Sequence, residues 1–96
     1  MKVEDRIKYT DRGFSYVEVT PYENIKWGGF CICNGCNNDF ENENMYLVYV
    51  LADTYCKECF NEWLERQKEY SQEDVEYDLH IQNGNDIEWY KYHLDR

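Results

Sequence analysis

Two short stretches near the start of the chain are dominated by β-branched and aromatic residues. They cover residues 7–10 and 14–19, and the polar segment 11–13 between them ends in Gly13. Such stretches are typical of strands, and a glycine can adopt the positive φ of a tight turn. We therefore predict an N-terminal β-hairpin, whose second strand ends at Pro21.

The middle of the chain changes from a strand pattern to a helical pattern. Residues 45–51 form an apolar run that predicts a strand. From residue 56 onward, apolar positions and glutamates separate onto two sides when they are placed at about 100° per residue. One side carries Cys56, Phe60, Trp63, Gln67 and Tyr70, and the other carries Glu58, Glu62, Glu65 and Glu69. This separation predicts one main amphipathic helix.

The last part of the chain shows a period of two. Residues 75–82 alternate between apolar and polar side chains, and residues 87–94 have the composition of a partner strand. Between them lies Asn83-Gly84, a pair typical of a two-residue hairpin turn. The pattern predicts a C-terminal β-hairpin.

The chain has 96 residues and a mass of 11.8 kDa, which indicates one domain. We expect a small α+β domain over residues 1–96, with the two hairpins in residues 1–30 and 71–96 around a centre at residues 31–70. A domain of this size buries a small core, so an additional stabilising element is expected.

The cysteines suggest what that element is. Four of the five cysteines form two C-x2-C pairs, Cys33 with Cys36 and Cys56 with Cys59, and nineteen residues separate the pairs. Four thiolates at this spacing are typical of a tetrahedral zinc site. We predict one structural Zn²⁺ held by these four residues. The alternatives are iron in a rubredoxin-like site, a C-x2-C redox pair and ordinary thiols.

The fifth cysteine, Cys31, lies two residues before Cys33. It either packs as a small buried residue or replaces Cys33 as a metal ligand, and we expect the first. A zinc ion with four cysteine ligands has no open position for a substrate. The sequence offers no competing pair of nucleophile and base, so we expect no enzymatic activity.

The segment 31–70 resembles a treble-clef zinc finger. The run Cys33-Asn34-Gly35-Cys36-Asn37 is similar to the zinc knuckle of that superfamily, residues 40–54 to its hairpin, and residues 55–60 to the start of its helix, as in the second half of a LIM-type zinc module. The resemblance implies that the first helical turn supplies the second ligand pair. The chain departs from LIM and RING domains, which bind two zinc ions with eight ligands. It also has no histidine between Cys36 and Cys59, as a treble-clef nuclease would need.

The charge of the chain limits its partners. Ten Lys and Arg against twenty Asp and Glu give a net charge of −10, which disfavours binding to DNA, RNA and anionic membranes. Residues 1–6 contain no apolar signal core, and the longest apolar run, residues 45–52, is too short to span a bilayer. We expect a cytoplasmic protein.

These features favour a non-catalytic adaptor, regulator or inhibitor that binds another protein with a basic surface. The expected contact residues are the helix glutamates and the aromatic residues of the last segment: Glu62, Glu65, Glu69, Trp89, Tyr90 and Tyr92. The alternative is an acidic nucleic-acid mimic, such as a phage-encoded inhibitor, that occupies a DNA- or RNA-binding protein. Direct nucleic-acid binding and a redox enzyme are weaker hypotheses.

Overall fold

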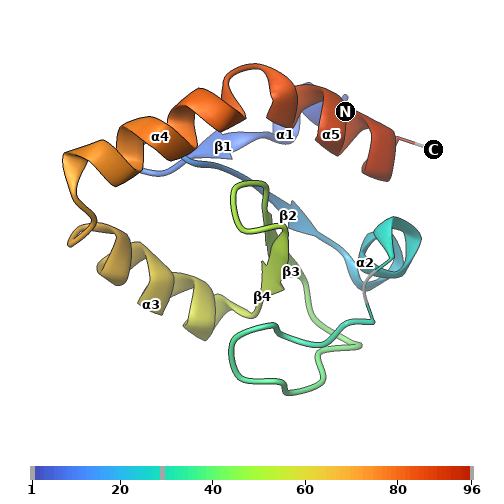
Figure 1. Ribbon diagram of the computed structural model, residues 1–96. Helices are drawn as coiled ribbons and strands as arrows, with labels where there is room; N and C mark the ends of the chain where they lie inside the picture. The colour runs from blue at the N-terminus through green and yellow to red at the C-terminus, as the bar shows by residue number, and fades with distance from the viewer. Residues whose placement is uncertain (1, 29, 96) are drawn as a thin grey trace.

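The structure is a computed structural model that describes residues 2–28 and 30–95. Its centre is an antiparallel sheet with the strand order β1-β2-β3-β4 (Figure 1). The strands are β1 (Lys8–Tyr9), β2 (Ser15–Val19), β3 (Met45–Val48) and β4 (Asp53–Tyr55). In the central pair, Val17 lies opposite Leu47 and Val19 opposite Met45, and all four side chains are buried. The predicted α+β class and the N-terminal hairpin β1–β2 are confirmed.

The turns of the sheet depend on left-handed backbone conformations. Gly13 has φ +94° in the β1–β2 turn, as the sequence predicts. The strand predicted over residues 45–51 is shorter than expected, because the chain turns after Val48 and Ala52 adopts φ +51° before β4.

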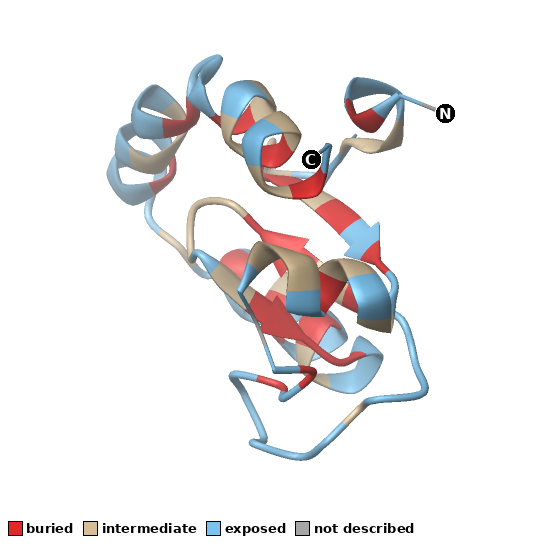
Figure 2. Ribbon diagram, turned by 90° about the vertical axis from the view of Figure 1, so that its right-hand side faces the viewer, coloured by how far each residue is buried: buried red, intermediate tan, exposed pale blue. Residues whose placement is uncertain are grey.

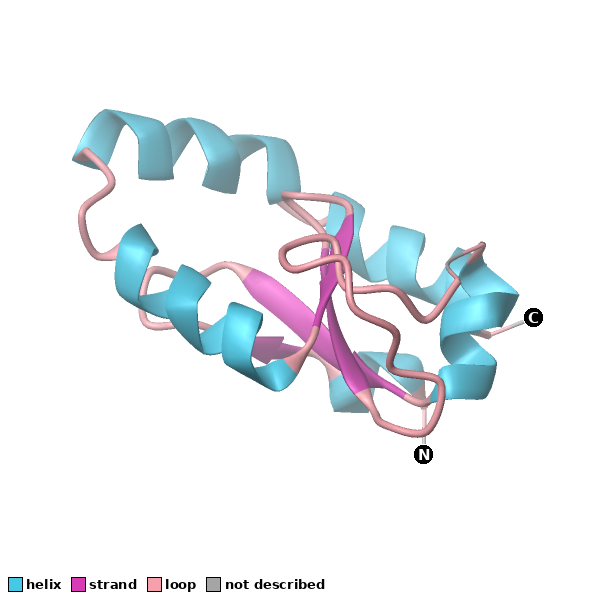
Figure 3. Ribbon diagram, turned by 90° about the horizontal axis from the view of Figure 1, so that it is seen from below, coloured by secondary structure: helices cyan, strands magenta, loops and turns pink. Residues whose placement is uncertain are grey.

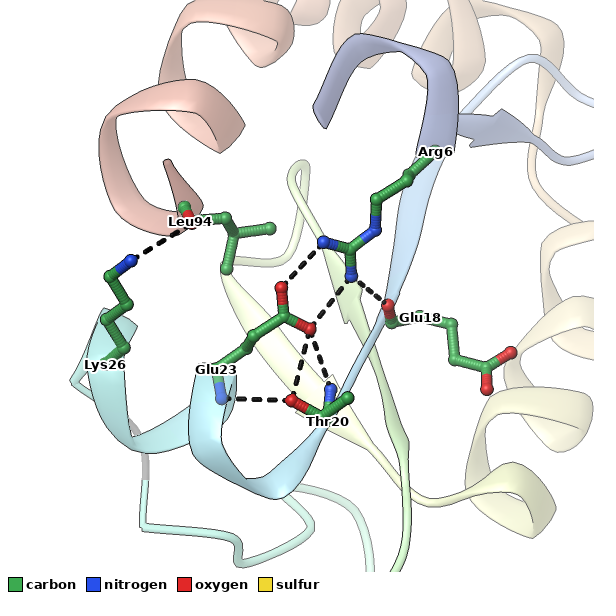
Figure 4. Close-up of polar contacts among 6 residues, drawn as sticks. All are labelled: Arg6, Glu18, Thr20, Glu23, Lys26 and Leu94. Carbon is green, nitrogen blue, oxygen red and sulfur yellow. Dashed lines mark hydrogen bonds and ion pairs between the residues drawn. The ribbon is translucent and has the colours of Figure 1, made fainter. Parts of the chain in front are cut away.

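A helix that the hairpin prediction missed follows β2. Helix α2 (Pro21–Trp27) begins at Thr20, whose side chain accepts a hydrogen bond from the backbone N–H of Glu23. The Glu23 carboxylate in turn accepts from the Thr20 backbone and from Arg6 (Figure 4). Gly28, with φ +108°, ends the helix.

Helix α3 (Lys57–Gln67) confirms the predicted amphipathic helix. Phe60, Trp63 and Gln67 are buried, as the helical pattern predicts. The Phe60 ring stacks on Tyr46 with a centroid separation of 4.5 Å, so α3 covers one face of the sheet.

The predicted C-terminal hairpin is wrong, because residues 71–95 form two helices, α4 (Gln72–Gln82) and α5 (Asn85–Leu94). Their inward positions follow a helical spacing: Val75, Leu79 and Gln82 in α4, and Asp86, Tyr90 and Leu94 in α5. Two of these residues are polar, so the apolar pattern alone hides the helical period. Asn83-Gly84 does form a turn, with φ +80° at Gly84, but the turn joins two helices.

The expectation of one main helix is wrong for the same reason, and a short helix α1 (Val3–Arg6) precedes the sheet. Helix α5 packs against α1 and α2 on the sheet face opposite α3 (Figures 1 and 3). Buried residues concentrate in the strands and on the inward sides of the helices (Figure 2). None of the helices in the described part of the chain has the length and apolar character needed to cross a bilayer.

Candidate metal centre

Four cysteine side chains meet beside the N-terminus of α3. The sulfur atoms of Cys33, Cys36, Cys56 and Cys59 all lie within 4.8 Å of one another, and the Cys36 and Cys56 sulfurs are 4.0 Å apart. These are the four residues that the two C-x2-C pairs predicted. Cys33 and Cys56 are buried, whereas Cys36 is exposed at the outer edge of the cluster.

The first pair lies in a tight turn closed by an isolated bridge between Ile32 and Asp39. Inside this turn, the Asn37 backbone N–H donates to the Cys33 carbonyl at 2.8 Å. Gly35 sits directly against the second pair, since a Cβ atom at this position would lie 3.0 Å from the Cys59 sulfur. A glycine between the first two ligands therefore allows the turn to approach α3 closely.

The second pair belongs to the start of α3. Cys56 is the N-cap residue, and its sulfur accepts a hydrogen bond from the backbone N–H of Cys59 at 3.5 Å. The N-terminus of a helix carries a partial positive charge, which stabilises thiolates there. Strand β4 leads directly into this cap, so the sheet fixes where the second pair lies.

The donor set fits a tetrahedral thiolate-binding metal. With Zn–S bonds of ~2.3 Å, the sulfur atoms of a regular tetrahedron lie ~3.8 Å apart, close to the 4.0 Å between the Cys36 and Cys56 sulfurs. Backbone N–H groups of Gly35 and Cys56 also point at the Cys33 sulfur, each at 3.3 Å. The four residues are therefore positioned to hold one metal ion.

The thiols differ in how readily they ionise. Burial raises the pKa of Cys33, but hydrogen bonds from the backbone N–H groups of Cys56, Cys36 and Gly35 outweigh it and bring the pKa to about 7. Desolvation and the neighbouring sulfurs raise the pKa of Cys59, and desolvation is also the main cause of the raised pKa of Cys56. A divalent cation at the centre would lower the pKa of all four thiols, because a metal-bound thiol is deprotonated.

Cys31 lies outside the cluster, as expected for a small buried residue. Its thiol donates to the Pro21 carbonyl at 3.6 Å, and its backbone N–H donates to Asn24 at 3.4 Å. Burial, followed by the charges of Glu41 and Asp39, raises the pKa of the Cys31 thiol. The Cys31 sulfur is therefore not one of the four sulfur atoms that form the cluster.

The predicted partner-binding residues separate into exposed and buried groups. Glu62 and Glu65 are exposed on α3, and Lys68 pairs with Glu65 at 3.0 Å. Glu69 is also exposed but lies in the turn after α3, because the helix ends at Gln67, earlier than the helical pattern predicted. On α5, Tyr92 is exposed, but Tyr90 is fully buried and Trp89 packs against neighbouring rings. The assignment of Tyr90 to the surface is thus wrong, because α5 directs this residue into the core.

No protein-family model matches this chain, and neither a curated protein nor a solved structure is significantly similar to it. Two features near the centre escaped the sequence reasoning. The first is α2, although Thr20-Pro21-Tyr22-Glu23 carries the signal of a capping box with proline at the first helical position. The second is a cluster of exposed apolar side chains on and after α2, formed by Tyr22, Ile25 and Phe30. No periodic pattern in the sequence indicates it.

Proposed function

We propose that this protein is a non-catalytic binding module, an adaptor, regulator or inhibitor, whose fold is stabilised by one structural zinc ion. The observation that carries the proposal is the convergence of four cysteine sulfurs within 4.8 Å of one another. Four thiolates fill the tetrahedral coordination of zinc, which leaves no position for a substrate or an activated water. The role of such a metal is to hold the turn at Cys33 against α3.

The proposal includes membership of the treble-clef superfamily. The order of elements supports it: the turn around Cys33 and Cys36 comes first, the hairpin of β3 and β4 follows, and α3 supplies the second ligand pair from its first turn. These elements lie in the order that the resemblance implies.

The charge distribution supports a basic protein as the partner. The carboxylates of Glu62 and Glu65 on α3 and of Glu69 in the turn after it are all exposed, and the chain as a whole carries a net charge of −10. Complementary charges accelerate encounter with a basic surface. We propose a cytoplasmic protein partner and no direct contact with nucleic acid.

Two measurements test this function. Native mass spectrometry of the folded protein should find one zinc ion per chain, and a folded chain without metal would contradict the structural role. A pull-down from the native cell should capture a specific protein, and capture should weaken when Glu62, Glu65 and Glu69 are all changed to Gln. Retained zinc content in this variant is the control for intact folding.

The second candidate function is mimicry of nucleic acid. It is favoured by the row of exposed glutamates on α3, since spaced carboxylates can replace phosphates on the surface of a nucleic-acid-binding protein. Displacement of labelled duplex DNA or RNA from the captured partner would select this function, whereas an undisturbed duplex would exclude it.

A further inference from the structure

Helix α2 presents apolar side chains on two sides. Trp27 packs inward against Trp89 of α5, and Asn24 is buried against Met45 of the sheet. On the outward side, Tyr22 and Ile25 are 76% and 64% exposed. A surface helix normally has a single apolar side, which faces the core. The outward side of α2 therefore lacks a partner within the described residues of the chain.

A groove lies beside this outward side. Tyr22, Ile25 and Phe30 line a hollow of about 780 Å³, and Glu41 and Asn42 of the following loop also line it. We call the first set its helix wall and the second set its loop wall. Phe30 is 80% exposed, more than any other large apolar residue in the described chain. Contiguous exposed apolar side chains of this kind mark protein-binding surfaces, and the volume lies in the range of ligand-binding clefts.

The helix wall of the groove is held firmly. Arg6 forms two hydrogen bonds with Glu23 at 2.6 and 2.9 Å, and Lys26 donates to the Leu94 carbonyl at 3.5 Å (Figure 4). These contacts fix α2 to the rest of the domain, while the side chains of Tyr22 and Ile25 remain exposed on its outward side. A surface that is ordered before binding loses less conformational entropy when a partner docks.

The loop wall is tied to the metal centre. The Phe40 backbone N–H donates to the Cys31 carbonyl at 2.7 Å, and the bridge between Ile32 and Asp39 continues into the turn that carries Cys33. Cys31 itself has φ +58°, a left-handed conformation that is costly for a residue with a Cβ atom. Its hydrogen bond to Asn24 of α2 links the two walls.

The lining of the groove contains one acidic residue, Glu41, and no Lys or Arg. Residues 27–56 contain four acidic residues, Asp39, Glu41, Glu43 and Asp53, and no Lys or Arg. Three of these acids belong to the loop that forms the second wall. A zinc ion with four thiolate ligands would add two further negative charges. The charge therefore favours a cationic occupant and disfavours a second copy of this chain, which carries a net charge of −10.

We propose that this groove binds an amphipathic segment of another protein, in which large apolar side chains contact Tyr22, Ile25 and Phe30 while adjacent Lys or Arg residues pair with the acidic loop. The inference rests on the proposed function as a binding module and names the surface and the chemistry of the partner. It adds α2 and the loop that follows it, as a second contact surface, to the glutamates that the proposed function names.

The test is selection of peptides from a random displayed library on the zinc-loaded protein, followed by fluorescence anisotropy with the enriched peptides. We expect enriched peptides to combine two or three large apolar residues with Lys or Arg. Phe30→Ser and Ile25→Ser should each weaken binding about tenfold or more. Glu41→Gln should weaken it less and reduce its salt dependence. Tyr77→Ser, which changes another exposed aromatic residue on α4, is the matched control and should bind normally.

Other outcomes would overturn the groove assignment. These are a library that yields no binder, peptides that bind the Phe30→Ser variant as tightly as the wild type, and peptides without basic residues. A dimer in analytical ultracentrifugation that is lost in Phe30→Ser would assign the groove to a second copy instead. Peptides that bind elsewhere would leave the proposed function intact, whereas failure to capture any protein from the cell would count against that function.

Discussion

The hydroxyl of Tyr90 on α5 lies 2.9 Å from the backbone nitrogen of Tyr49 and accepts its N–H. The same hydroxyl lies within donating distance of the carbonyls of Ser15 and Leu47, at 3.1 and 3.3 Å. The ring is fully buried, and burial raises the pKa of Tyr90, which keeps the hydroxyl protonated as a donor. One side chain of α5 therefore contacts β2, β3 and the turn that follows β3.

This relationship predicts that Tyr90→Phe destabilises the fold. The change removes one oxygen and leaves the Tyr49 N–H without its acceptor, which costs about 1–3 kcal/mol when the group is buried. Urea unfolding of the zinc-loaded protein measures the loss. Tyr77→Phe removes an exposed hydroxyl and is the control. Equal stability of the two variants would show that the hydroxyl of Tyr90 does not stabilise the sheet.

We predict that zinc content separates the five cysteines into two groups. Replacement of Cys33, Cys36, Cys56 or Cys59 by Ser should abolish stoichiometric zinc and cooperative folding, because zinc binding contributes about 10–16 kcal/mol in small zinc peptides. Cys31→Ser should keep one zinc ion per chain, since its sulfur contacts Pro21 instead. Native mass spectrometry and circular dichroism measure both properties, and zinc loss in Cys31→Ser would refute the ligand set.

Gly35→Ala should weaken metal binding although position 35 supplies no ligand. The added Cβ would meet the Cys59 sulfur at 3.0 Å and its Cβ at 3.1 Å, so the turn must move away from α3. We expect at least a tenfold loss of zinc affinity in competition with a chelator, which corresponds to about 1.4 kcal/mol. Gly84→Ala is the control. Its added Cβ would meet no atom within 4 Å, so any effect would come from the positive φ at this position and not from contact with a ligand. Unchanged affinity of Gly35→Ala would contradict the observed packing.

The ion pair between Arg6 and Glu23 predicts a pH-dependent contribution to stability. The hydrogen bonds from Arg6 lower the pKa of Glu23, although partial burial opposes them. A carboxylate with a lowered pKa stabilises the fold above its ordinary pKa of about 4.3 and loses that contribution as the pH falls through the lowered value.

Glu23→Gln should therefore reduce stability by about 1 kcal/mol at neutral pH, because the pair is only partly exposed and bidentate. Thermal melts should show a constant deficit between about pH 6 and 8, where Glu23 stays ionised. Glu65→Gln, which breaks an exposed pair with Lys68, should change little. A deficit that grows as the pH falls would contradict the assignment.

The sequence predicts the metal centre well because both ligand pairs are local. The spacing within Cys33–Cys36 and Cys56–Cys59 limits where each pair of sulfurs can point, and the helical pattern after Cys56 is strongly amphipathic. The N-terminal hairpin is equally local, since Gly13 marks its turn. These elements need no information from distant parts of the chain.

The C-terminal helices could not be read in the same way, because their buried faces include polar residues with distant partners. Gln82 accepts from the Ser15 backbone N–H at 2.9 Å and donates to the Gly13 carbonyl at 3.0 Å. A pattern that counts only apolar residues assigns Gln82 and Asp86 to the solvent side. The resulting period of two favours a strand, and only the contacts of Gln82 with Ser15 and Gly13 show that this residue faces inward.

The docking of α5 also has a consequence for the speed of folding. Tyr90 and Ser15 are 75 positions apart in the chain, whereas Cys36 and Cys56 are separated by 20. Closing the longer loop costs about 1 kcal/mol more chain entropy, and long-range contacts slow folding. We expect the cysteine cluster to assemble early, and the arrival of α5 on β2 to be the slow step that completes the native state.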